Sequence, residues 1–240
     1  MAVLARKSRR RKKHGFRGVL ILAILVFAAV CLVNFIGKYP KEMIDLFKYN
    51  PEARGFALAY PAHKNDSSFG KITEAELSGG IPLFQQWDER WGYFHYGSSV
   101  LGITGCGPTC LSMVVAGLTG NADATPAAVA DYSEKNGYYV EGVGTAWDLM
   151  TSGAAGYGLS SQEIPLSEET MTAALSAGHP LIVSLGPGDF TSSGHFIVIT
   201  GYSDGKFTVN DPNSGLLSKE SWSYDRLAPQ IRSIWAYSVT

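Results

Sequence analysis

The feature that most constrains this chain is an uninterrupted apolar run near its amino terminus. Residues 19–36 read VLILAILVFAAVCLVNFI, and Asn34 is the only strongly polar member. As an α-helix, which rises 1.5 Å per residue, this run is about 27 Å long, close to the ~30 Å hydrocarbon core of a bilayer. The sequence therefore predicts a single transmembrane helix over residues 18–37.

Positive charge is concentrated directly before this run. Eight of the 20 basic residues lie within residues 1–17, and no acidic residue precedes Glu42. Because basic flanks stay on the cytoplasmic side, we expect residues 1–17 to be cytoplasmic and the rest to lie outside the cell membrane. Two other interpretations stay open. A cleaved signal peptide would need a small-residue cleavage site, and a lipoprotein signal would need a small residue where Val30 precedes Cys31.

The charge of the remaining chain excludes one class of partner. Residues 18–240 carry 12 basic residues against 21 acidic ones, so the balance there is strongly negative. Nucleic-acid binding needs a basic face for the phosphates, and we expect no nucleic-acid partner. Three cysteines are too few for a disulfide-stabilised scaffold.

Residues 38–80 and 81–240 differ in pattern. The first segment predicts a stalk or linker with one short amphipathic helix over 41–49. The second has a normal single-domain length and predicts an α+β fold, with helices before an antiparallel sheet. The expected helices cover 108–118, 126–135, 146–152 and 168–177; the expected strands cover 180–185, 195–202, 207–210 and 233–239, with a hairpin turn at 203–206.

The densest chemical signal is Gly105-Cys106-Gly107-Pro108-Thr109-Cys110. Pro108 suits the first turn of a helix, and the apolar residues that follow predict a buried one. Cys106 would then sit just ahead of the helix amino terminus, where free N–H groups and the helix dipole favour a thiolate nucleophile. Cys110 lies one turn further on and is expected in the core. A dithiol or zinc site is the alternative, but three residues separate the cysteines and no second pair exists, so no metal or other cofactor is expected.

A nucleophilic cysteine needs a base and an orienting acceptor. Among five histidines, His195 opens an apolar strand and is the best-placed candidate base. Asp211 ends the partner strand of the predicted hairpin and could orient the imidazole. With a strict two-residue turn Asp211 would face the other side of the sheet, so this pairing requires a longer turn, a bulge or a break at Pro212, with Asn210 as the fallback partner. Gln85 and Gln86 are candidate oxyanion donors.

Four segments together resemble papain-like cysteine peptidases, specifically the peptidase-like branch related to bacteriocin double-glycine leader peptidases. They begin at Ile81, Gly105, Gly194 and Val209, and read IPLFQQWDERWG, GCGPT, GHFIVITGY and VNDP. The resemblance covers nearly all of 81–240 and implies a cysteine-bearing helix packed on an antiparallel sheet. It implies Cys106 as nucleophile, His195 as base, Asp211 as orienting acid and Gln86 as oxyanion donor.

The chain also departs from that branch. Leader peptidases proper are fused to multi-span transporters with ATPase domains, whereas this sequence has one apolar span and no phosphate-binding loop motif. We therefore expect a membrane-anchored, extracytoplasmic thiol hydrolase that cleaves a peptide or related amide bond. The alternatives are a non-catalytic module that binds a peptide or cell-wall fragment in the same cleft, and a thiol oxidoreductase that uses Cys106 and Cys110.

Overall fold

The computed structural model describes the backbone of residues 4–240 and the side chains from Arg17 onward. The expected basic segment 1–17 thus falls almost wholly outside the described side chains. The chain forms two compact units, residues 1–44 and residues 45–240, which are described separately.

The first unit consists mainly of one long helix, α1 (Leu4–Ile36). Its stretch Arg17–Ile36 spans 20 residues with a mean hydropathy of 3.1, and none of it is buried by the protein. This helix is long and apolar enough to cross a membrane, although a signal sequence near the amino terminus has the same character. The next helix, α2 (Lys41–Tyr49), lies where an amphipathic helix was predicted and crosses the boundary between the units.

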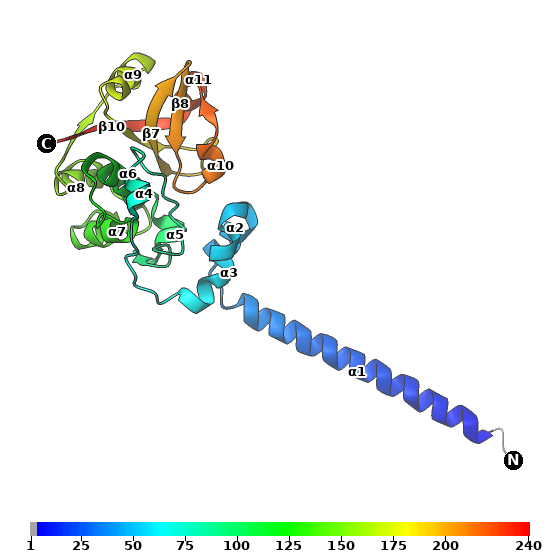
Figure 1. Ribbon diagram of the computed structural model, residues 1–240. Coiled ribbons are helices and arrows are strands. Elements are labelled where there is room, and N and C mark those ends of the chain that lie inside the picture. Colours follow the sequence, from blue (N-terminus) through cyan, green and yellow to red (C-terminus); the bar gives the residue numbers. More distant parts are fainter. Residues whose placement is uncertain (1–3) are drawn as a thin grey trace. The chain divides into compact units, whose positions relative to one another are not determined.

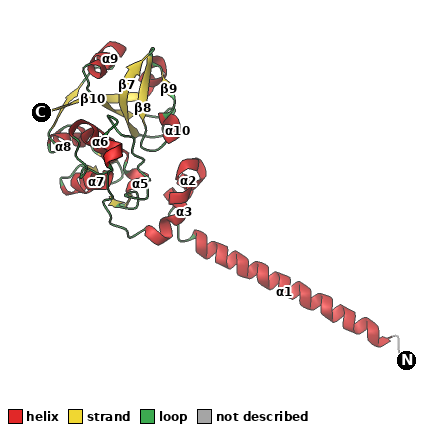
Figure 2. Cartoon of the chain, in the orientation of Figure 1, coloured by secondary structure: helices red, strands yellow, loops and turns green. Residues whose placement is uncertain are grey.

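The second unit is built on a six-stranded antiparallel sheet (Figures 1 and 2). In spatial order the strands are β5 (Leu159–Glu163), β10 (Ile231–Val239), β6 (Leu181–Leu185), β7 (His195–Ser203), β8 (Lys206–Asn210) and β9 (Ser221–Trp222). Four of them fall where the sequence predicted strands; β5 and β9, at the two edges, were not predicted.

Helices lie on both faces of this sheet. The helix α6 (Cys106–Thr119) packs against β7 and against α7 (Pro126–Lys135), and α9 (Glu168–Ser176) also contacts β7. The predicted helix at 146–152 is instead a 3₁₀ turn, η2 (Trp147–Met150), followed by α8 (Ser152–Ala155). The remaining helices are η1 (Pro51–Ala53), α3 (Arg54–His63), α4 (Glu74–Leu77), α5 (Leu101–Thr104), α10 (Gly215–Ser218), α11 (Tyr224–Leu227) and η3 (Ala228–Gln230). The two-stranded ribbons are β1 (His95–Tyr96) with β2 (Ser99–Val100), and β3 (Tyr139–Val140) with β4 (Gly144–Thr145).

Both faces of the central strands are buried, which explains their unbroken apolar runs. Ile182 and Val198 belong to the cluster around α6, whereas Leu181 and Ile199 belong to a second cluster that includes Met171 of α9. Alternate side chains of a strand point to opposite faces, so a strand covered on both sides is apolar at every position. The sheet thereby holds the start of β7 rigidly beside the start of α6.

The compact unit extends further toward the amino terminus than the predicted domain. Ala53, Phe56 and Ala57 are buried, and the ring of Phe56 stacks on Tyr93 with centroids 4.3 Å apart. The hydroxyl of Tyr93 also donates to the carbonyl of Phe56 at 3.0 Å. Part of the segment expected to be a stalk at 38–80 therefore packs as an integral part of the unit that begins at Asp45.

Candidate active site

Cys106 is the first residue of α6, whereas the glycine-rich motif predicted it just ahead of a helix that begins at Pro108. The following positions, including Leu111 and Met113, are fully buried, so the helix is fixed in the core. Gly107 is required by close packing: a Cβ at this position would lie 2.7 Å from Cγ2 of Thr145. This close approach places the strand end at Thr145 directly against the first turn that carries the thiol.

His195 begins β7 and hydrogen-bonds to Asp211 through its ring. Its Nε2 atom lies 2.7 Å from Oδ1 of Asp211, and the two side chains are 8 % and 1 % exposed. The bond involves Nε2, which leaves Nδ1 as the ring nitrogen available to the thiol of Cys106. The structure thus brings together three of the four predicted site residues.

A β-bulge allows His195 and Asp211 to meet. The hairpin has a two-residue turn, with Ser203 opposite Lys206, which alone would put Asp211 on the wrong face. Between Ile199 and Gly201 the register shifts by one residue, so that Ile199 pairs with Val209. One extra residue on β7 reverses the side-chain alternation of everything before it, and residues 195 and 211 then share a face. The sequence required a longer turn, a bulge or a break at Pro212 for this pairing, and the structure has the bulge.

The electrostatics of the site favour a thiolate–imidazolium pair. Burial is the largest influence and opposes charge on both groups: it raises the pKa of the Cys106 thiol and lowers that of the His195 imidazole. Attraction outweighs it. Hydrogen bonding to His195 and to the N–H groups of Phe196 and Gly107 holds the pKa of Cys106 below its usual value. The carboxylate of Asp211, followed by Cys106, raises the pKa of His195 to about 10.

Among the residues whose side chains the structure describes, the other cysteines and histidines do not share this environment. Cys110 is buried, and burial followed by the nearby charges of Cys106 and Asp211 raises its pKa well above the usual value. His63 lies 2.8 Å from Asp66 on the surface. Of the histidines whose side chains the structure describes, only His195 lines the pocket that contains Cys106. Among the described residues, no three His, Cys, Asp or Glu side chains gather as they would at a metal site.

Gln86 is buried beside the site, but its amide points into the protein. Its Nε2 atom donates to the carbonyls of Gly102 and Ile103, at 3.1 and 3.3 Å, in the segment that leads to Cys106. Its backbone N–H donates to the carbonyl of Pro212 at 2.7 Å. In this conformation Gln86 joins the cysteine-bearing segment to the loop after Asp211. Its two amide hydrogens have acceptors already, so stabilising an oxyanion would require one of these bonds to be released.

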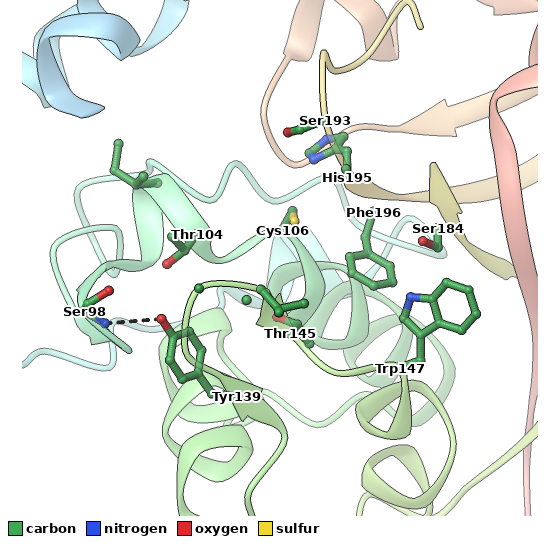
Figure 3. Close-up of a pocket in the computed structure, with 15 residues that line it drawn as sticks. Ser98, Thr104, Cys106, Tyr139, Thr145, Trp147, Ser184, Ser193, His195 and Phe196 are labelled. Carbon is green, nitrogen blue, oxygen red and sulfur yellow. Dashed lines mark hydrogen bonds between the residues drawn. The ribbon is translucent and has the colours of Figure 1, made fainter. Parts of the chain in front are cut away.

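A cleft of about 580 Å³ contains Cys106 and His195. Figure 3 shows two different sides: Ser98, Thr104 and Tyr139 lie on one side of Cys106, and Ser184, Phe196 and Trp147 lie on the other. Trp147 is half exposed and packs edge-on against Trp235, with ring centroids 5.4 Å apart. The described lining carries no Asp, Glu, Lys or Arg side chain. Sequence reasoning missed these walls, because a single aromatic residue after a short ribbon has no distinctive local pattern.

The family to which this fold and cleft belong follows from the sequence comparison. The sequence model of the Peptidase_C39 like family matches residues 79–239. The chain belongs to this family. The match confirms the predicted resemblance to papain-like peptidases related to the leader peptidases, and it identifies residues 79–239 as a peptidase-like domain.

Three solved structures are similar at low identity. The peptidase domain of Streptococcus ComA, a bifunctional transporter, is 18 % identical with a TM-score of 0.42, over 57 % of this chain and 93 % of that one. A double-glycine-motif protease from an AMS/PCAT transporter, in complex with its leader peptide, is 17 % identical with a TM-score of 0.40, over 71 % and 98 %. A C39-like peptidase from Bacillus anthracis is 16 % identical with a TM-score of 0.38, over 69 % and 96 %. No curated protein matches the sequence.

Proposed function

We propose that this Peptidase_C39 like protein is a cysteine peptidase-like hydrolase that cleaves a peptide or related amide bond. The observation that carries the proposal is the 2.7 Å bond between His195 and Asp211 in the cleft that also holds Cys106. A thiolate, an imidazolium and a carboxylate in that order supply a nucleophile, a general acid and a group that orients it.

In the proposed reaction the Cys106 thiolate attacks the scissile carbonyl and forms a tetrahedral intermediate. The His195 imidazolium then protonates the leaving amine, which gives a thioester. The neutral imidazole next removes a proton from water, the hydroxide attacks the thioester, and the Cys106 thiolate leaves as the acid is released, which restores the thiolate–imidazolium pair. Throughout, Asp211 holds the ring orientation and stabilises the charged imidazole.

The oxyanion formed in each step needs hydrogen-bond donors. The backbone N–H of Cys106, at the start of α6, is one candidate, since the first N–H groups of a helix have no acceptor within it. Gln86 is the other candidate, provided that substrate binding draws its amide away from the carbonyls of Gly102 and Ile103. The inward orientation of this amide is also what favours the alternative function, a non-catalytic module that binds a peptide or cell-wall fragment in the cleft.

We further propose that α1 anchors the protein in the cell membrane, with residues 1–17 in the cytoplasm and the peptidase-like domain outside. The support is the length and hydropathy of Arg17–Ile36 and the basic residues that precede it. The substrate would then be an extracytoplasmic peptide or peptide-like molecule. A lining without fixed charges other than the Cys106–His195 pair suits a neutral segment of that substrate.

Labelling of the full chain with a thiol-directed peptidyl electrophile tests the catalytic proposal. We expect the parent and Cys110→Ser proteins to be labelled at Cys106 and to cleave peptides from a random library, and Cys106→Ala to do neither while keeping its circular dichroism spectrum. Labelling of Cys106 without any cleavage would favour the binding module. Equal labelling of the parent and Cys106→Ala proteins would refute the proposal, and loss of activity in Cys110→Ser alone would favour a thiol oxidoreductase.

A further inference from the structure

The loop that follows Asp211 is held by a segment far away in the sequence and outside the family match. Asn50 donates from Nδ2 to the carbonyl of Asn213 at 2.7 Å and to its Oδ1 atom at 3.2 Å. The Oδ1 atom of Asn50 in turn accepts from the N–H groups of Glu52 and Ala53 and caps η1. Residues 163 positions apart are thus joined by a defined hydrogen-bond pattern.

Glu52 makes the second set of contacts to the same loop. Its Oε2 atom accepts from the hydroxyl of Ser214 at 2.9 Å and from the N–H of Leu216 at 3.1 Å. A Cβ on Gly215 would lie 2.9 Å from Oε1 of Glu52, so the carboxylate rests directly on the loop backbone. Hydrogen bonds to an ionised acceptor are stronger than neutral ones, so this carboxylate is an effective clamp.

The clamped loop sets the position of the triad carboxylate. The N–H of Asn213 donates to Oδ1 of Asp211 at 2.8 Å, and the same oxygen accepts from His195. The N–H of Asp211 donates to the hydroxyl of Ser218, which itself donates to the carbonyl of Ser214 at 2.8 Å. Asp211 is therefore oriented at both its backbone and its carboxylate by the residues that Asn50 and Glu52 hold.

We propose that Asn50 and Glu52 are positioning residues for the Asp211–His195 pair, so that the segment before the family match is a working part of the site. This inference rests on the proposed function for its consequence in catalysis, but its geometry does not. The segment has its own attachment through buried Ala53, Phe56 and Ala57. Removal of the Glu52 carboxylate should therefore release the loop without detaching the segment.

The test compares Glu52→Ala, Glu52→Gln and Asn50→Ala with the control Glu74→Ala in the full-length protein. Glu74 is an exposed glutamate that also precedes the family match and lies in the first turn of α4. A glutamine at 52 keeps an oxygen that can accept from Ser214 and Leu216, so Glu52→Gln should largely rescue the effects of Glu52→Ala. The readouts are nuclear magnetic resonance titration of His195, the iodoacetamide reaction rate of Cys106 against pH, and kcat and KM for a cleaved peptide.

For Glu52→Ala and Asn50→Ala we expect a lower pKa of His195, slower alkylation of Cys106 at neutral pH, and a kcat reduced about tenfold with KM nearly unchanged. Glu74→Ala should match the parent in all three. Unchanged His195 titration and Cys106 reactivity in folded Glu52→Ala and Asn50→Ala proteins would overturn the inference. If the parent cleaves no peptide yet both shifts occur, the proposed function fails and the positioning role stands.

Discussion

At the scale of single residues, the site depends on two charges that burial alone would remove. Cys106 and His195 each lose solvation in the protein. Cys106 is kept charged by His195 and by the N–H groups of Phe196 and Gly107, and His195 is kept charged by Asp211 and Cys106. A buried charge is tolerated only where such partners are fixed in place. The buried carboxylate, the bulge in β7 and the clamp on the loop after Asp211 are therefore parts of one arrangement that keeps the thiol ionised.

The pH dependence of this pair is a direct test. Because the pKa of Cys106 lies below its usual value, its rate of reaction with iodoacetamide should level off at a lower pH than that of an ordinary thiol, whose rate rises about tenfold per pH unit up to its pKa of ~8.5. Peptide cleavage should fall as the pH rises through about 10, where His195 loses the proton it gives to the leaving amine. Stopped alkylation followed by mass spectrometry measures the reaction rate of Cys106, and initial rates of peptide cleavage measure the alkaline decline.

The control for this prediction is Asp211→Asn. This change removes the charge that raises the pKa of His195, so the alkaline limb should move to lower pH. The stability of the fold should depend on pH in the same direction. Because the pKa of His195 in the folded protein lies above the usual 6.5, its contribution to the free energy of unfolding is full below pH 6.5 and is lost as the pH rises through about 10. An alkylation rate in the parent that keeps rising up to about pH 8.5, as that of an ordinary thiol does, would contradict the ion pair.

At the scale of elements, the sequence predicted those parts of the site whose signals are local. The start of α6 follows from Gly105 to Pro108, and the hairpin follows from its turn residues. Because side chains alternate between the two faces of a strand, the sequence also showed that an irregularity must lie between His195 and Asp211. It did not show that the irregularity is a bulge at Thr200, since no local residue preference marks that position. The clamp by Asn50 and Glu52 had no signal at all, because a contact across more than 160 residues leaves no periodic trace.

The edge strands and the cleft walls were missed for a related reason. The strand β5 reads LSSQE and is buried only at Leu159, so it lacks the alternation that predicts a half-buried strand. It exists because β10 offers it a hydrogen-bonding edge, with Tyr237 opposite Ser161. The position of Trp147 likewise depends on its contact with Trp235, on β10. Contacts between residues that are distant in the sequence determine such elements, and local sequence patterns do not reveal these contacts.

The close packing of α6 against the ribbon β3–β4 can be tested by a substitution at Gly107. Gly107→Ala would place a methyl group within 3 Å of the side chain of Thr145, which is itself buried. We expect a loss of about 1–3 kcal/mol in the free energy of unfolding, together with slower alkylation of Cys106 as the first turn shifts. Denaturant unfolding and the iodoacetamide rate measure the two effects.

Gly55→Ala is the matched control. Gly55 lies in the helix α3, and a Cβ there meets no atom within 4 Å. Alanine is the better helix former by about 1 kcal/mol, so this variant should be as stable as the parent or slightly more stable, with unchanged Cys106 reactivity. A Gly107→Ala protein that matches Gly55→Ala in both measurements would show that the close approach to Thr145 is not required.

At the scale of the whole molecule, the two units have opposite solvent requirements. The side chains of Arg17–Ile36 have no protein cover, whereas the unit from Asp45 onward buries its own core. Exposing 20 residues of such hydropathy to water is unfavourable, which is the physical basis of the proposed anchor. The second unit carries the excess of acidic residues.

Fractionation of cells that express the chain with a tag at each end tests this division. We expect the full chain to sediment with membranes, to resist carbonate extraction and to dissolve in detergent with both tags on one polypeptide. A chain that lacks residues 1–36 should be soluble and should keep the reactivity of Cys106. Val26→Asp with Phe27→Asp, at the centre of the span, should weaken insertion, since each aspartate costs about 3 kcal/mol there.

The orientation of the anchor is tested in the same cells. In the proposed orientation, with the basic amino-terminal segment in the cytoplasm, protease added to spheroplasts should remove the carboxyl-terminal tag and leave the amino-terminal one. A soluble product that has lost its amino-terminal tag would instead identify residues 1–36 as a cleaved signal. That result would remove the tether and leave the argument for the site intact, since every contact that orients Cys106, His195 and Asp211 comes from residues after Asp45.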